Sequence, residues 1–147
     1  MVTNDSIRKD FGVVINLVKR QYAKIDNLKG KCELTPKQGM IIGFIHVNTL
    51  DKIDVYQKDI EKEFSLRRST ASEILALMEK NGLIVRVQLK NDARMKKLVL
   101  TEKAEKFLLK VKNDSDFITD LAFNGITEEE KLVLDKILKK VIKNLEE

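Results

Sequence analysis

The chain has 147 residues, one cysteine, no tryptophan and a formal net charge of +5 at pH 7. A single cysteine excludes an internal disulfide framework and fits a reducing compartment. No stretch approaches the ~18 apolar residues that a membrane span needs, and the N-terminus lacks the apolar segment of a signal peptide. We therefore expect one cytoplasmic domain, and one proline with six glycines leaves little material for an all-β fold.

The first two predicted elements are helices. Apolar residues recur every three or four positions over residues 6–28. A second helix begins at "TPKQ", where Thr35 is the expected N-cap, Pro36 the first helical residue and Gln38 the reciprocal capping partner. The segment that follows, "GMIIGFIHVN", is apolar on nearly every side, so this helix is expected at the centre of the core.

The middle of the chain predicts a helix-turn-helix. Residues 52–55 are expected to form a short strand and residues 57–64 a short helix. A tight turn around Ser65 then leads into a helix over residues 67–81, whose apolar stripe leaves its N-terminal half polar. Two helices joined in this way form a helix-turn-helix.

Two alternating segments come next. Residues 83–90 and 97–101 alternate apolar and polar side chains on either side of a charged stretch, which predicts a hairpin. A helix-turn-helix followed by a hairpin is a winged helix. The expected fold class is therefore mainly α with a small β-hairpin wing. Thr101 and a capping box at Thr127 and Glu130 then open two further helices.

The helices that flank the expected winged-helix lobe, residues 33–101, carry wide apolar stripes. A chain of this size can hardly cover all of them, and burial against a second copy is the economical solution. We therefore expect residues 5–29 and 102–147 to be dimerisation helices. The alternative is that they fold back on their own lobe. The second helix of a helix-turn-helix, here residues 67–81, is its recognition helix. A symmetric dimer would set two recognition helices about 34–36 Å apart, which is one turn of DNA.

The charge excess lies in one segment. Residues 67–97 contain eight basic and three acidic side chains, a difference equal to the whole net charge, and the rest of the chain is balanced. A concentrated basic segment on a neutral body is the footprint of polyanion binding. The alternative interpretation of any charge run is a solvated face.

Three stretches, in this order, resemble the MarR family (multiple antibiotic resistance regulators). They are "LTPKQ" at 34–38, "STASEILALMEKNGLIVR" at 69–86 and "NDARMKKLVLT" at 91–101, and the resemblance extends over nearly the whole chain. It implies a winged-helix transcription regulator that binds double-stranded DNA. It also implies that Arg94 enters the minor groove while Asp92 holds its guanidinium, and a narrow minor groove does attract arginine. The alternative is an ordinary hairpin tip with a local ion pair.

Polar and basic side chains on the recognition helix and the wing are the expected DNA contacts. Serine and threonine near a helix N-terminus suit phosphate, and Arg68 suits a bidentate contact to guanine. Glu73 is expected either to accept a hydrogen bond from cytosine or to orient an arginine. The candidates are Arg67, Arg68, Ser69, Thr70, Ser72, Glu73, Arg86, Lys90, Asp92, Arg94, Lys96 and Lys97.

A small-molecule effector is a further implication of the resemblance, since relatives often bind aromatic or lipophilic acids between the dimer helices and the DNA-binding lobe. The candidate lining residues are Phe11, Tyr22, Met40 and Phe44, with ordinary core packing as the alternative. Cys32 does not match the cysteine of peroxide-sensing relatives, which lies in their first helix. The only histidine, His46, is expected in the core or an interface.

No catalytic or metal motif is recognisable. One histidine and one cysteine, far apart, assemble neither a triad nor a zinc site, so we expect no enzyme, cofactor or metal. The expected function is a homodimeric regulator on a palindromic operator, a repressor relieved by a small ligand. The alternative is a winged-helix interaction module whose basic wing docks on an acidic protein.

Overall fold

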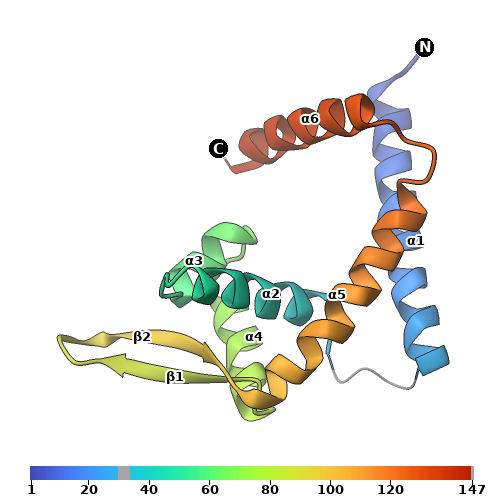
Figure 1. The fold of residues 1–147 in the computed structure, drawn as a ribbon. Helices are drawn as coiled ribbons and strands as arrows, with labels where there is room; N and C mark the ends of the chain where they lie inside the picture. Colours follow the sequence, from blue (N-terminus) through green and yellow to red (C-terminus); the bar gives the residue numbers. More distant parts are fainter. Residues whose placement is uncertain (30–33, 147) are drawn as a thin grey trace.

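The computed structural model describes residues 1–29 and 34–146. In chain order its elements are α1 (Asn4–Lys29), α2 (Pro36–Leu50), α3 (Gln57–Glu63), α4 (Arg68–Lys80), β1 (Ile84–Leu89), β2 (Asp92–Leu100), α5 (Glu102–Ala122) and α6 (Glu128–Glu146). Helices α2, α3 and α4 gather at the base of the hairpin (Figure 1). From that base α5 leads away to α6, and α1 runs beside α5.

The predicted helix starts are confirmed by their caps. Thr35 Oγ1 accepts a hydrogen bond from the Gln38 N–H at 3.2 Å, and Gln38 Oε1 accepts one from the Thr35 N–H at 3.1 Å. Thr127 and Glu130 make the same reciprocal pair before α6. Such caps satisfy backbone donors that a helix leaves open, and each typically stabilises the protein by about 1 kcal/mol.

The core lies between α2, α3, α4 and the base of the hairpin. As predicted, α2 is central, because Ile41, Ile42 and Ile45 are all fully buried. The side chains packed around them come from α3, α4, the residue before β1 and the first residue of β1: Ile60, Leu75, Met78, Leu83 and Ile84. This packing of a helix-turn-helix on a two-stranded hairpin is a winged helix, and the predicted fold class is confirmed.

The hairpin differs from the prediction in where its second strand begins. Strand β2 starts at Asp92 rather than at residue 97, so most of the charged stretch is strand. Gln88 pairs with Lys96 but Leu89 pairs with Asp92, which leaves residues 93–95 without partners on β1. The wing therefore carries a bulge near its tip, and a bulge re-aims the side chains that it contains.

The predicted strand at residues 52–55 is wrong, because the structure has no strand in that segment. Val55 is buried, and its carbonyl accepts one hydrogen bond, at 2.8 Å, from the Leu98 N–H of β2. One such bond fastens the segment to the hairpin without forming a ladder, which needs a repeated pattern of bonds.

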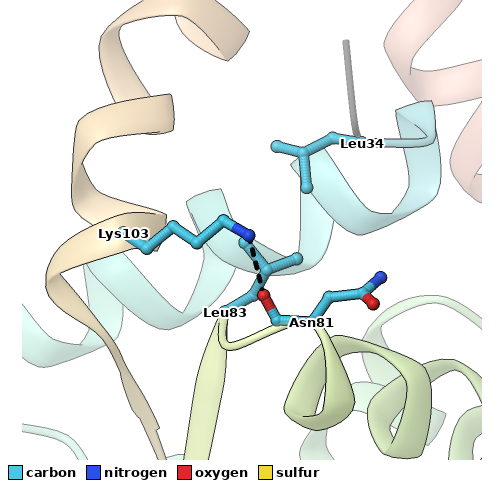
Figure 2. Close-up of a pocket in the computed structure, with 4 residues that line it drawn as sticks. All are labelled: Leu34, Asn81, Leu83 and Lys103. Atoms are coloured by element: carbon cyan, nitrogen blue, oxygen red, sulfur yellow. Dashed lines mark hydrogen bonds between the residues drawn. The ribbon is translucent and has the colours of Figure 1, made fainter.

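The end of α4 is joined to the start of α5 by three hydrogen bonds. The Thr101 hydroxyl donates to the Gly82 carbonyl, the Thr101 N–H donates to the Leu83 carbonyl at 3.1 Å, and Lys103 Nζ donates to the Asn81 carbonyl at 2.9 Å. Figure 2 shows the last of these across a small pocket lined by Leu34, Asn81, Leu83 and Lys103. The carbonyls of residues 81–83, in the connection that follows α4, are thus satisfied by the start of the next helix.

The outer helices keep much of their apolar surface exposed. No described residue of α6 is buried, and Ile137 and Leu145 are 51% and 81% exposed. On α1, Phe11 is 49% exposed, while Tyr22 further along the helix hydrogen-bonds Ser115 of α5 at 3.2 Å. Only the second half of α1 is therefore packed on α5. None of the described helices is long and apolar enough to cross a membrane.

Candidate DNA-binding site

Helix α4 presents its two faces as its sequence predicted. Ala71, Leu75 and Met78 are buried on the side that faces the core. The opposite side exposes the polar candidates, which are Arg68, Ser69, Thr70, Ser72 and Glu73. The turn before the helix passes through Ser65, whose φ of 47° is left-handed, and this tight turn sets the direction of α4 relative to α3.

The first turn of α4 has open donors. Arg67 occupies the N-cap position and its side chain makes no capping hydrogen bond. Backbone N–H groups at the start of a helix have no partner within it, and together with the helix dipole they favour an anion. The exposed guanidinium groups of Arg67 and Arg68 add positive charge at the same end. A phosphate group is the natural ligand of such a helix start.

The wing exposes a second group of cations. Lys90 lies in the hairpin turn, and Arg94 and Lys96 follow on β2, all exposed to solvent. Asp92 Oδ1 accepts a hydrogen bond from the backbone N–H of Arg94 at 2.9 Å. Its described contact thus holds the Arg94 backbone within the bulge. That Asp92 also holds the guanidinium, as the resemblance implies, stays a prediction.

Two candidates turn toward the protein instead of solvent. Lys97 Nζ lies 3.2 Å from Asp54 Oδ1, in the segment between α2 and α3. Arg86 Nε lies 3.7 Å from Glu79 Oε2 on α4, and the Arg86 side chain is only 23% exposed. The other ten candidates are exposed. The expected DNA contacts of Arg86 and Lys97 therefore compete with partners inside the chain.

The four predicted effector-pocket residues have different environments. The Phe44 ring packs edge-to-face on Phe64, with 5.9 Å between the ring centroids, and this pair borders the core. Met40 is 55% exposed, and Phe11 and Tyr22 lie on α1 as described above. None of the four lines the pocket of Figure 2. His46 is partly buried on α2, and Cys32 lies outside the described residues.

Known proteins share this arrangement. A model of the MarR family matches residues 33–95, which include α2 to β1 and the tip of the wing. The transcription regulator MarR from Oenococcus oeni PSU-1 is 33% identical to this chain. That comparison covers 90% of this chain and 98% of that one, with a TM-score of 0.72. The chain belongs to the MarR family.

Two further relatives align over most of their length. YybA, an uncharacterized HTH-type transcriptional regulator of Bacillus subtilis (strain 168), is 27% identical over 144 residues, which is 97% of this chain and 90% of that protein. A Listeria monocytogenes protein assigned to the MarR family and crystallised with a 26mer DNA is 26% identical. That comparison covers 93% of this chain and 87% of that one, with a TM-score of 0.71.

Membership of the MarR family decides two of the predictions. It confirms that the chain is a transcription regulator of the winged-helix type. Because MarR-family regulators are non-enzymatic, it also confirms that the protein is not an enzyme.

Two acidic residues of the MarR-type lobe were not predicted to take part in the site. They are Asp54 and Glu79, the partners of Lys97 and Arg86. A signal for Glu79 exists in the sequence, since only residues 81–83 separate the end of α4 from β1. So short a connection turns the chain back on itself and brings residue 79 beside residue 86. No comparable local signal marks Asp54, because its partner is 43 residues away.

Proposed function

We propose that this protein binds double-stranded DNA as a homodimer on a palindromic operator and represses transcription. One observation carries the proposal: the polar face of α4 and the tip of the wing expose ten of the candidate side chains, within the segment that holds the whole charge excess. The DNA present in the crystals of the similar Listeria protein supports the same conclusion.

Base recognition belongs, in this proposal, to α4. Its exposed N-terminal half enters the major groove, where Arg68 donates to O6 and N7 of a guanine. Ser69 and Thr70, beside the open backbone donors of the first turn, bind phosphate. These phosphate contacts place the helix in register, and the arginine supplies sequence preference.

The wing binds the adjacent minor groove. Arg94 stands on the bulge and enters the groove, whose negative potential increases as it narrows. Lys90 and Lys96 bind the phosphates on either side. This part of the contact reads DNA shape more than base identity, so we expect a preference for A·T-rich flanks.

A second copy of the chain covers the outer helices. The exposed apolar residues of α6 and of the first half of α1 support this step, because a monomer would leave them in water. Two-fold symmetry repeats the recognition helix about 34–36 Å away, and the operator is then palindromic. An aromatic or lipophilic acid bound between these helices and the lobe would relieve repression.

Selection of bound sequences from random duplex DNA tests the proposal. The expected result is an enriched palindrome, bound with an affinity that falls steeply as salt increases. No enrichment, together with binding to acidic proteins, would favour the interaction-module alternative. Footprinting the enriched site beside a promoter, with transcription measured in vitro, then tests the sign of regulation.

A further inference from the structure

Arg86 has an environment that a DNA contact does not explain. It shares a face of β1 with Ile84, which is 1% exposed, and it is paired across the hairpin with Leu98, which is 3% exposed. The stem of Arg86 therefore leaves the sheet at the edge of the core. Its Nε atom is buried, and no acceptor among the described residues lies within hydrogen-bonding distance.

The nearest charge is Glu79, in the last part of α4. The 3.7 Å between Arg86 Nε and Glu79 Oε2 exceeds the about 2.7–3.2 Å of an N–H···O hydrogen bond. A buried donor without an acceptor is costly, and a small movement of β1 toward α4 would satisfy it. The pair is thus close to a better arrangement that the free protein does not adopt.

The second strand of the wing is already fastened. Lys97 pairs with Asp54, and the Leu98 N–H donates to the Val55 carbonyl. Strand β1 meets α4 first at its base, where Ile84 is buried with Leu75 and Met78. Further along the strand, Arg86 and Glu79 form a charged pair between β1 and α4. This pair therefore contributes to the angle between wing and α4, and DNA must accept the wing and α4 at the same time.

We propose that Arg86 and Glu79 are a positioning pair that sets the wing relative to the recognition helix and closes to a direct hydrogen bond when DNA binds. The inference rests on the proposed DNA-binding function and deepens it. Neither side chain contacts DNA. Each acts by reducing the freedom that wing and helix would otherwise lose on binding.

Substituting Glu79 separates this role from a simple charge effect, because the two predict changes of operator affinity in opposite directions. Removing a carboxylate near DNA makes the protein more positive, which by electrostatics alone strengthens binding. The positioning role predicts that Glu79→Ala weakens operator binding by about five- to tenfold. The side chain of Glu79 is 46% exposed, so this variant is expected to fold, and its melting temperature checks that it does.

The full experiment measures operator affinity at several salt concentrations for the wild type, Glu79→Ala, Arg86→Gln and the double variant. We expect both single variants to lose operator affinity. The double variant should bind no more weakly than the weaker-binding single variant. The salt dependence of binding should stay unchanged in all three. Glu105→Ala on α5 is the charge-matched control. Lys90→Gln is the contrasting one, since each lost phosphate contact reduces the salt slope by about 0.9, and a dimer loses one contact from each protomer.

Three results bear on the inference in different ways. Absence of operator binding by the wild type would overturn the proposed function itself. A wild type that binds, with Glu79→Ala binding equally well or more tightly, would overturn the positioning role alone. So would a smaller salt slope for Arg86→Gln, because it would make Arg86 a phosphate contact.

Closure of the pair has its own readout in NMR spectra of arginine side chains. The Nε–H resonance that disappears in Arg86→Gln should exchange more slowly with solvent in the operator complex than in the free protein. In Glu79→Ala that added protection should be absent. Equal protection with and without DNA would show that the pair does not close.

Discussion

The carboxylate of Asp92 is bonded to the backbone of Arg94, two residues along the chain, at a distance of 2.9 Å. A short acidic side chain that binds the main chain two residues on is a recurrent way to hold a turn. Here it acts where the pairing of β1 and β2 shifts register. The bulge therefore has a defined backbone, from which the exposed Arg94 side chain extends.

Arg94→Ala should leave the fold and the dimer intact, because an exposed side chain at a hairpin tip contributes little to the core. Operator affinity should fall at least tenfold, about 1.4 kcal/mol, since a minor-groove guanidinium is lost. The loss should be larger on A·T-rich than on G·C-rich flanks. Titration of labelled operators at ~150 mM salt measures both. Wild-type affinity in this variant would mean that the wing is only a turn.

Substitutions of Asp92 test whether its carboxylate binds the backbone N–H or the guanidinium of Arg94. Asp92→Ala should weaken operator binding by a smaller factor than Arg94→Ala, because the arginine remains but its backbone is less ordered. Asp92→Asn keeps an oxygen that accepts from the Arg94 N–H, so it should bind nearly as well as the wild type. If Asp92→Asn lost as much affinity as Asp92→Ala, the carboxylate charge, and hence the guanidinium, would be its partner.

Arg68→Ala distinguishes base recognition from phosphate contact. If Arg68 binds guanine, affinity for the operator should fall by about 1–3 kcal/mol, while affinity for random DNA falls much less. The comparison requires both substrates at one salt concentration. An equal loss on the two would assign Arg68 to phosphate.

Leu138→Asp should shift the protein from dimer toward monomer or aggregate. Leu138 lies in the apolar stripe of α6 and is 36% exposed in the single chain, and burying a charge there against a second copy is costly. Lys136→Asp, on the opposite side of the same helix, is the matched control and should remain dimeric. Analytical ultracentrifugation at micromolar concentration measures the mass. A wild-type protein that is monomeric under these conditions would remove the basis for a palindromic operator.

Local chemistry in the sequence was enough to predict most of the architecture. The capping boxes at Thr35 and Thr127 depend on residues three positions apart, and the apolar stripe of α4 depends on a period that a short segment contains. The exposed face of α4 follows directly, because it is the remainder of that helix. For the same reason the candidate residues on α4 lie where they were expected.

Features that depend on distant partners were not predictable in the same way. Residues 52–55 have the composition of a strand, but their described backbone bond to the hairpin is the single one from Leu98 to Val55, so they form no strand. Strand β2 begins at Asp92, before the segment in which apolar and polar residues alternate. The polar residues Asp92 and Lys96 pair with β1 on either side of the bulge, and the sequence there lacks the alternation that marks a strand. Lys97 and Arg86 look like free cations in the sequence, yet each has an acid beside it that only the fold supplies.

The bonds from Thr101 and Lys103 tie the start of α5 to residues 81–83, the connection that follows α4. Helix α5 has 21 residues and is roughly 30 Å long, so a tilt of α5 would be passed through these bonds to the connection that carries the recognition helix. A tilt of a few degrees at the far end displaces the DNA-reading end by ångströms without altering its interior. In a dimer, such a tilt would change the distance between two intact recognition helices, and that distance is what a fixed helical turn of DNA measures.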